Sequence, residues 1–453
     1  MSSTLIKDAD VVVTMDENRR EISGGYVLVN DGVVTDVGEA DALPAVESDV
    51  AVVDARGCVV TPGLVNTHHH LFQSLTRAVP QGASKPLFGW LTALYQIWPK
   101  LRPEDFALAA QVGLSELALS GCTMSSDHQY FYPEGVKLDD TIAAAQSVGV
   151  RFHATRGSMS IGESKGGLPP DNMVEDEDAI LADCERVITA FHDAEPGAMV
   201  QVAIAPCSPF SVSKELMVQS AELGRKHGLL LHTHLAENDE DVRYSLEHFG
   251  CRPGQYAEEL GWVGDDVWHA HCVQLDDEEI GLFARTKTGV AHCPCSNCRL
   301  ASGIAPVVAM LHQGVPVGLG VDGSASSDSG HLLAEARQAL LLQRVNGGAD
   351  VMEPREALEL ATRGGAAILG RDDCGSLAVG KRADIAVWNL NEWGGLGAWD
   401  PVAALILTGP HRVRDLFVEG RKVVDGGVLQ TLDLAQTASS ARAATKRLQD
   451  LTC

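Results

Sequence analysis

The strongest local chemical signal in the chain is the run Thr67-His68-His69-His70. In an extended strand, alternate side chains point to the same face, so His68 and His70 can reach one ion while His69 points away and is expected to be structural. Imidazole is a common metal ligand, but histidines at strand ends also act as plain hydrogen-bonding groups. This run alone therefore leaves a metal site and a structural role open.

Three later clusters favour the metal site. The chain carries His232-Thr233-His234, then His269-Ala270-His271, then Asp322, each directly at the end of a short apolar run. Three imidazoles and one carboxylate make a nitrogen and oxygen ligand set that suits a borderline ion such as Zn²⁺, with one position left for water. Four such clusters at the ends of four apolar runs indicate one shared site.

The elements that must position these residues alternate between strand and helix from about residue 59 to about residue 370. This alternation predicts a (β/α)₈ TIM-type barrel, although an open doubly wound sheet fits it too. We favour the barrel because the carboxyl ends of its strands converge on one mouth, where the polar clusters can meet. The predicted strands are Val59–His68, Cys122–Asp127, Val150–Thr155, Val200–Ala205, Leu229–His234, Val267–His271, Gly289–His292 and Val315–Val321, and the predicted helices include Asp105–Leu119, Glu175–Phe191, Lys214–His227, Asp276–Thr286 and Gly330–Val345.

Both flanks of the predicted barrel have a different pattern. Residues 1–58 and 376–430 contain short strand-like pieces separated by turn signals such as Asn30-Asp31-Gly32 and Asp425-Gly426-Gly427. We expect the two flanks to pair into one small β-sandwich domain beside a metal-dependent barrel of residues 59–370. The Ala-rich, amphipathic stretch at 434–453 predicts a C-terminal helix.

Composition excludes several classes of partner. The 453 residues carry 61 acidic and 35 basic side chains, a net charge of −26, which disfavours nucleic acids and anionic lipid surfaces. No segment approaches the roughly 18 apolar residues of a spanning helix, and the first residues lack a signal-peptide core. A cytoplasmic protein with a small, uncharged partner is the default expectation. The eleven scattered cysteines are expected to be mostly reduced and buried.

Several motifs together resemble a known family, the amidohydrolase superfamily, and within it the aminohydrolases that act on nucleobases and related aromatic heterocycles. The resemblance covers essentially the whole chain. The motifs that carry it are Pro62–His70, His234-Leu235-Ala236-Glu237, Ala270-His271-Cys272, His292-Cys293-Pro294-Cys295-Ser296-Asn297, Val321-Asp322-Gly323, Gly375-Ser376-Leu377 and Gly380-Lys381-Arg382-Ala383-Asp384.

The resemblance implies a ligand set and proton-handling residues. The family's metal ligands fall on His68, His70, His234 and Asp322, and its catalytic residues on Glu237, His271 and Asp322. The only lysines between Thr123 and Pro206 are Lys137 and Lys165, in loop-like surroundings, so no bridging lysine is expected on the fourth strand. We therefore expect one Zn²⁺ per chain, with Fe²⁺ as the alternative ion.

Physical needs suggest how these groups divide the work. Water near neutral pH is a poor nucleophile, and a bound Zn²⁺ lowers its pKa to roughly 7. Asp322 can accept the water proton and later pass it to departing ammonia, and Glu237 can protonate the ring nitrogen. His271 can orient the nucleophile by hydrogen bonding.

Substrate-binding candidates are less constrained. Gln73 can pair with the amide edge of a heterocycle or serve at a helix start, and Arg156 can bind a ring carbonyl or an acidic side chain. His128 can line the pocket or close the end of the barrel. Trp90 and Trp98 can stack on a flat ring, although core packing is the commoner role of tryptophan.

The expected reaction is zinc-dependent hydrolytic deamination of an oxidised purine, 8-oxoguanine to urate plus ammonia. The resemblance is strongest in residues 66–78, 156–170 and 205–212, which fall in loops at the barrel mouth. Deamination of guanine or isoxanthopterin, and chlorohydrolase or aminohydrolase activity on an s-triazine, are the alternatives. A catalytically silent binding protein is a remote one. Members of this family often self-associate, so a homo-oligomer is expected.

Overall fold

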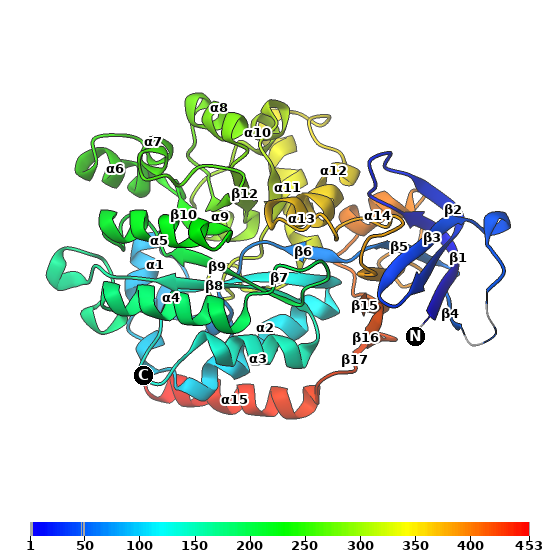
Figure 1. The fold of residues 1–453 in the computed structure, drawn as a ribbon, viewed down its shortest axis with the longest axis horizontal. Helices are drawn as coiled ribbons and strands as arrows, with labels where there is room; N and C mark the ends of the chain where they lie inside the picture. Colours follow the sequence, from blue (N-terminus) through cyan, green and yellow to red (C-terminus); the bar gives the residue numbers. More distant parts are fainter. Residues whose placement is uncertain (1–2, 47, 49, 453) are drawn as a thin grey trace.

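The computed structural model describes residues 3–46, 48 and 50–452, which form two sheets and a surround of helices (Figure 1). An eight-stranded parallel sheet carries the polar clusters, and a nine-stranded sheet drawn from both chain ends lies beside it. The predicted fold class, a TIM-type barrel with a small β-sandwich domain from the two chain ends, is confirmed as a barrel beside a separate sheet drawn from both ends. The predicted segments 1–58 and 434–453 include residues 1, 2, 47, 49 and 453, which lie outside the described residues. The eleventh cysteine, Cys453, is among them.

The barrel sheet runs in chain order. Its strands are buried on both faces, as is typical of parallel sheets covered by helices. The ring closes where the Thr67 amide donates to the Leu319 carbonyl over 2.9 Å. The strands are β6 (Leu64–Asn66), β7 (Cys122–Gln129), β8 (Arg151–Ser158), β9 (Val200–Pro206), β10 (Leu231–Leu235), β11 (Val267–His271), β12 (Gly289–His292) and β13 (Val317–Leu319).

Helices cover the outside of the barrel. In α5 (Lys214–Lys226) the buried residues are spaced at three and four, and the Ser213 side chain caps the first turn by accepting from the Leu216 amide. The other helices of the barrel layer are α1 (Leu87–Leu94), α2 (Pro103–Leu119), α3 (Leu138–Val148), α4 (Glu177–Phe191), α6 (Asp239–His248), α7 (Pro253–Glu259), α8 (Asp277–Thr286), α9 (Pro294–Arg299), α10 (Val307–Gln313), α11 (Leu332–Gly347), α12 (Pro354–Glu359) and α13 (Gly365–Ile368).

The first predicted strand, Val59–His68, is divided between the two sheets, which corrects that prediction. β5 (Cys58–Pro62) pairs with β1 and β14 of the second sheet, whereas β6 opens the barrel. Gly63 makes the crossing possible because a Cβ atom there would lie 2.2 Å from the Thr123 side chain. The continuous apolar run hides this break, since both pieces are fully buried.

The second sheet joins the two ends of the chain. Its order is β17-β16-β15-β14-β5-β1-β2-β3, and β4 pairs in parallel with residues 4–7 of β1. A buried ion pair between Arg151 of β8 and Asp384 ties this sheet to the barrel, with Nε and Oδ2 2.7 Å apart. The strands are β1 (Ser3–Val13), β2 (Glu21–Asn30), β3 (Val33–Glu39), β4 (Ala51–Asp54), β14 (Ile385–Asn389), β15 (Asp415–Val418), β16 (Arg421–Asp425) and β17 (Val428–Leu429), and α14 (Pro401–Leu407) follows β14.

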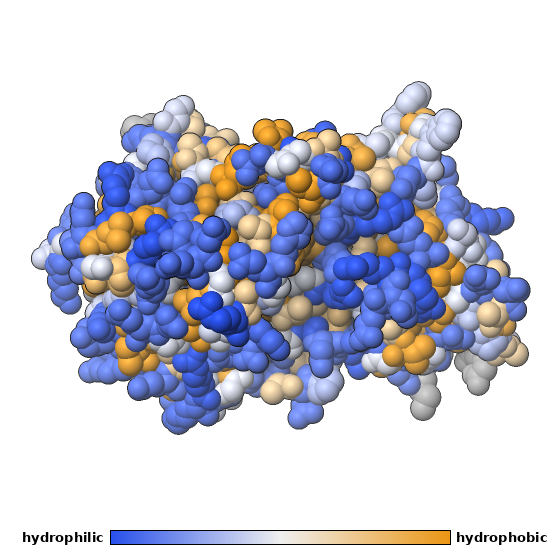
Figure 2. Space-filling view, turned by 90° about the horizontal axis from the view of Figure 1, so that it is seen from above, coloured by the Kyte–Doolittle hydropathy of each residue, from blue (hydrophilic) through white to orange (hydrophobic). Residues whose placement is uncertain are grey.

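The last helix and the surface complete the molecule. α15 (Leu434–Asp450) packs along the outside of α2, at the bottom of Figure 1. Hydrophilic side chains cover most of the face in Figure 2, with hydrophobic groups in smaller patches between them. Among the described residues, no helix combines the length and hydropathy needed to cross a membrane. The ten described cysteines are free thiols, and most are buried.

Candidate metal centre and active site

Four side chains meet at the carboxyl end of the barrel strands. His68 and His70 follow β6, His234 lies near the end of β10, and Asp322 comes shortly after β13. The Nε2 atoms of His70 and His234 are 3.1 Å apart. Asp322 Oδ1 lies 3.4 Å from His68 Nε2 and 3.3 Å from His70 Nε2. All four residues are buried, so the barrel brings together side chains more than 250 positions apart.

Hydrogen bonds fix the orientation of each imidazole. The Nδ1 atoms of His70 and His234 face the carbonyl oxygens of His128 and Cys207, over 2.7 and 2.6 Å. A carbonyl oxygen only accepts, so both rings carry their proton on Nδ1 and keep a lone pair on Nε2. Such carbonyl partners are typical of histidines that ligate metals.

His68 reaches the same state through a second histidine. His232 Nδ1 lies 2.8 Å from the Trp268 carbonyl and must donate to it, which leaves His232 Nε2 as an acceptor. That atom lies 2.8 Å from His68 Nδ1, so His68 also holds its proton on Nδ1. His68 Nε2 is buried with no hydrogen-bond partner. Three Nε2 lone pairs therefore converge on one point.

The arrangement fits a single transition-metal ion. Burial lowers the pKa values of His68 and His234 well below 6.5, so both rings are neutral and their lone pairs are available. A lone pair on buried His68 Nε2 that no donor satisfies is costly unless an electrophile occupies the centre. Three imidazoles and a carboxylate are the ligand types found in metal centres that keep one position open for water.

Asp322 is held in a strained but well-supported position. Its φ of +61° lies in the left-handed region, where the carboxylate reaches back over its own turn to accept from the Gly323 amide. The hydroxyls of Ser296 and Ser326 both donate to Oδ2. Burial alone would raise the pKa of Asp322, but the adjoining imidazole rings of His68 and His70 hold it well below its usual value, so the carboxylate is ionised.

Glu237 and His271 lie beside this centre. Glu237 Oε2 is 3.5 Å from His271 Nε2, and its Oε1 is buried with no hydrogen-bond partner. Burial, reinforced by the charges of Asp322 and Asp241, raises the pKa of Glu237 well above its usual value. The buried carboxyl group of Glu237 therefore holds a proton more readily than an exposed glutamate does. Asp241 also anchors it, since its Oδ2 accepts from the Glu237 amide over 3.0 Å.

His271 is oriented by the segment after β12. Its Nδ1 lies 2.9 Å from Asn297 Oδ1, and its Nε2 is 3.9 Å from Asp322 Oδ2. Ser296 and Asn297 belong to α9, so the Cys-Pro-Cys-Ser-Asn run forms a short helix that supports Asp322 and His271. The side chains of Ser296 and Asn297 contact Asp322 and His271 directly.

A cavity opens over the metal centre. It is lined by the polar residues of the site together with an aromatic and aliphatic cover from α1 and the segments after β7 and β9. Gln73, Tyr130, Ser208 and Ser211 supply further polar groups near the centre. The lining comprises His70, Gln73, Leu87, Trp90, Leu91, Tyr95, Tyr130, Cys207, Ser208, Phe210, Ser211, His234, Glu237, His271, Leu300, Asp322 and Ser326.

Of the substrate-binding candidates, the structure brings Gln73 to the cavity. Its amide Nε2 lies 3.4 Å from the Tyr130 hydroxyl, and its Oε1 accepts from the Ala325 amide over 3.3 Å. Trp90 also lines the cavity and donates to the Ala325 carbonyl, whereas Trp98 is buried in the neighbouring core cluster.

His128 lies behind the metal centre rather than in the cavity lining. Its Nε2 donates to the Ala205 carbonyl over 2.8 Å, and its Nδ1 is buried without a hydrogen-bond partner. It offers a ligand atom within 4.8 Å of those of His68, His70 and His234. His128 thus belongs to the imidazole cluster, a placement that its position at the end of the second barrel strand did not predict.

Arg156 lies on the outer side of the barrel wall and is absent from the cavity lining. Its Nε donates to Asp183 over 2.7 Å and its Nη2 to Glu175 over 2.8 Å. Nη1 donates to the Gly157 carbonyl, and the guanidinium lies 3.8 Å above the Tyr132 ring. The structure therefore pairs Arg156 with acidic side chains, the second role that its sequence context left open.

Several residues of the site carried no sequence signal of their own. Tyr130, Ser208, Ser211 and Ser326 line the cavity as ordinary loop residues. His232 is different, because it stands two positions before His234, on the same strand face, and this spacing indicates a shared role. Its contact with His68 was visible only in the structure.

Comparisons with known proteins place the chain among enzymes. The model of the Amidohydrolase family matches residues 59–423. The chain is 46% identical over 451 residues to 8-oxoguanine deaminase of Pseudomonas aeruginosa (strain PAO1), with 99% of each chain covered. It is 37% identical to isoxanthopterin deaminase of an unknown prokaryotic organism, covering 98% of this chain and 97% of that protein.

Triazine-degrading enzymes are similar as well. Hydroxydechloroatrazine ethylaminohydrolase of Pseudomonas sp. (strain ADP) is 36% identical, with 99% of this chain and 96% of that protein covered. Among solved structures, atrazine chlorohydrolase from Arthrobacter aurescens TC1 complexed with zinc superposes with a TM-score of 0.93 at 34% identity. That match covers 98% of this chain and all of the other.

Proposed function

Because the chain belongs to the amidohydrolase family, we propose that it deaminates 8-oxoguanine hydrolytically, with one water consumed and urate and ammonia formed. The observation that carries the proposal is the 46% identity to an 8-oxoguanine deaminase along the full length of both chains. The complete set of ligating and proton-handling side chains at the barrel mouth supports it. A catalytically silent binding protein has no need to keep that set.

One metal ion per chain is part of the proposal. His68, His70, His234 and Asp322 would hold it, and Zn²⁺ is favoured over Fe²⁺ because a related structure was solved with zinc. Zinc in such a site makes water acidic enough to act as a nucleophile near neutral pH. The other steps belong to side chains of the protein.

Asp322 and Glu237 divide the proton transfers. The ionised Asp322 accepts the proton of the attacking water on a carboxylate oxygen and later gives it to the departing amine. Glu237 is protonated before the reaction and donates from its carboxyl to the ring nitrogen beside the attacked carbon, and it takes back the proton of the newly added hydroxyl when the C–N bond breaks and the carbonyl forms. His271, held by Asn297, orients the nucleophile through Nε2. These steps avoid a separated charge on the ring.

Gln73 is our proposed contact to the edge of the heterocycle. Its amide faces the cavity beside Tyr130, and the lining residues Trp90 and Leu300 offer apolar surface to a flat ring. A site that hydrogen-bonds a polar edge discriminates against substrates that lack it, because the site's own groups are then left unpaired. We therefore expect a preference for 8-oxoguanine over guanine.

A panel of substrates tests the proposal. Zinc-loaded enzyme is assayed for release of ammonia from 8-oxoguanine, guanine, isoxanthopterin and cytosine, and of chloride or amine from substituted s-triazines. We expect the highest kcat/KM with 8-oxoguanine, and an inactive Glu237→Gln variant serves as the control for contaminating deaminases. Equal kcat/KM on guanine and 8-oxoguanine would remove the 8-oxo preference.

The similar proteins supply the second candidate. The isoxanthopterin deaminase and the triazine enzymes each match almost the whole chain at 34–37% identity. Ammonia from isoxanthopterin alone, or chloride from a chlorotriazine with no ammonia from any purine, would move the activity to those branches. Full metal content with no turnover on the whole panel would favour a binding protein.

A cytoplasmic homo-oligomer completes the proposal. The net charge of −26 supports a protein without nucleic-acid or anionic-membrane partners. Light scattering on the purified protein measures the subunit number, and fractionation of the producing cells locates it. A monomer, or the protein outside the cytoplasm, would correct these two points and leave the proposed reaction unchanged.

A further inference from the structure

A second cavity lies away from the barrel mouth, on the outer side of α2. It has a volume of about 470 Å³ and lies between α2, the start of α11, the segment before β15 and α15. No residue that lines it also lines the active-site cavity. It is called the arginine cavity below and is lined by Arg77, Val112, Ser115, Glu116, Leu119, Ser120, Ser329, His331, Arg412, Leu434, Thr437, Ala438, Ala441 and Arg442.

The arginine cavity has an excess of positive charge, opposite in sign to the net charge of the chain. The chain as a whole has a net charge of −26, yet this cavity is lined by Arg77, Arg412 and Arg442 against one carboxylate, Glu116. Arg77 pairs with Glu116. Within the described part of the chain, no ion pair or hydrogen bond engages the guanidinium groups of Arg412 and Arg442. Two cations thus face the cavity without a counterion.

Polar groups deeper in the arginine cavity are also unsatisfied. Ser115 on α2 is 5% exposed, and its hydroxyl has no hydrogen-bond partner among the described residues. The buried Nε of Arg77 likewise lacks one. α11 begins at this cavity, and the side chain of its N-cap residue His331 makes no capping hydrogen bond. Buried donors without acceptors and a helix N-terminus are both complemented by an anion with several oxygens.

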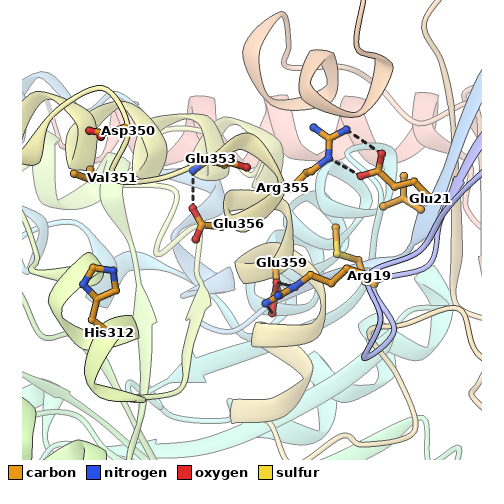
Figure 3. Close-up of a pocket in the computed structure, with 11 residues that line it drawn as sticks. Arg19, Glu21, His312, Asp350, Val351, Glu353, Arg355, Glu356 and Glu359 are labelled. Atoms are coloured by element: carbon orange, nitrogen blue, oxygen red, sulfur yellow. Dashed lines mark hydrogen bonds and ion pairs between the residues drawn. The ribbon is translucent and has the colours of Figure 1, made fainter.

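A cleft elsewhere on the molecule provides the contrast. The cleft in Figure 3, of about 520 Å³, lies between β2 and α12 and also contains arginines. There, Arg355 pairs with Glu21 over 2.5 Å and Arg19 with Glu359 over 2.8 Å, as the dashed lines show. Its arginines are neutralised within the protein, so the cleft has no excess positive charge to offer. Arg412 and Arg442 therefore differ from the arginines of this cleft, which each have a carboxylate partner.

We propose that the arginine cavity binds a phosphate group, carried by inorganic phosphate or by a small phosphorylated metabolite. The planar guanidinium forks of Arg412 and Arg442 present paired donors that match phosphate oxygens. Ser115 supplies a neutral donor in the cavity, and the lining also reaches His331, the N-cap residue of α11. The cavity is larger than one phosphate needs, which leaves room for an attached organic group.

Calorimetric titration of the holoenzyme at constant ionic strength tests the proposal, with inorganic phosphate in one arm and adenosine monophosphate in the other. We expect saturable binding in at least one arm, weakened tenfold or more in the double variant Arg412→Gln/Arg442→Gln. The control Arg285→Gln/Arg421→Gln removes the same two charges from exposed positions outside the cavity and should bind like the parent protein.

The two arms distinguish the sources of the phosphate group. Similar affinity in both means that the phosphate alone is recognised, and a much tighter nucleotide means that the organic part contributes. The double variant should keep its metal and its turnover, because neither arginine touches the active site. No saturable binding in either arm, or equal binding by the double variant, would overturn the proposal. So would binding that survives in the double variant but disappears in His234→Ala, which would place the phosphate at the metal centre.

Discussion

The inner and outer sides of one barrel wall use their polar groups in opposite ways. At the mouth, three imidazoles keep an Nε2 lone pair aimed at a common point, and their other nitrogens are occupied. On the outer side, Arg156 has its donors engaged by Asp183, Glu175 and a carbonyl oxygen. The side chains at both places are polar and buried. A site differs from a structural contact because some of its hydrogen-bonding capacity is left unused and converges on one point.

The largest effect is expected from removing a ligand at the mouth. His234→Ala deletes one of the converging lone pairs, so bound metal and turnover should both fall to background. His69→Gln is the matched control, since this neighbouring ring faces α2 next to Gly113 and is expected to leave the metal in place. Elemental analysis and ammonia release measure the two properties. Equal metal loss in the two variants would mean that the metal is lost because the protein misfolds, and not because a ligand is missing.

Glu237→Gln should separate proton transfer from metal binding. The amide keeps the size of the side chain, but it cannot give up a proton as the carboxyl group with its raised pKa can. The kcat should therefore fall by roughly 10²–10⁴. Metal content should stay near that of the parent protein. Glu247→Gln on the exposed face of α6 is the control and should leave kcat unchanged. Loss of metal in Glu237→Gln would instead make Glu237 a ligand.

Arg156→Met tests the outer side of the wall. Removing the guanidinium leaves Glu175 and Asp183 without their partner, and because both are partly exposed we expect a loss of about 2–3 kcal/mol in the free energy of unfolding. Urea denaturation measures this loss. The kcat/KM of the folded variant should stay within a few-fold of the parent protein. A collapse of kcat/KM at unchanged stability would restore Arg156 as a substrate contact.

His153 tests whether one unsatisfied imidazole makes a site. It is buried in the barrel, and among the described residues its Nε2 has no hydrogen-bond partner and no other ligand group converges on it. Burial lowers its pKa to about 3. The unfolded chain, with a histidine pKa near 6.5, binds the proton more readily, so stability falls as pH drops below about 6.5. His153→Gln should reduce this slope by up to about 1.4 kcal/mol per pH unit. An unchanged slope would assign the acid sensitivity to other groups.

The periodicity of the chain predicted most of the fold. The strands at Val267–His271 and Gly289–His292 have the predicted bounds, and the other barrel strands after the first overlap their predicted ranges. Apolar runs predict buried strands whichever sheet they join, so the crossing at Gly63 between β5 and β6 had no local signal.

Only part of the site could be predicted, because the sequence shows residue types at strand ends but not the contacts that they make. Histidines and acids at strand ends were visible as residue types, and the barrel geometry implies that they meet. The partner of Arg156 was not visible, because an arginine at a strand end reads the same whether it faces the mouth or the surrounding helices. The supporting roles of His232 and Asn297 depend on which donor meets which acceptor, and this is decided by packing across distant strands.

We propose that the unused lone pairs at the mouth hold one catalytic metal ion. Elemental analysis of the fully loaded protein, run in parallel with turnover as metal is removed by a chelator and restored, tests it most directly. We expect about one Zn²⁺ or Fe²⁺ per chain, with activity rising in proportion to occupancy up to one equivalent. Two equivalents that are both needed for full activity, or full activity in metal-free protein, would contradict the account.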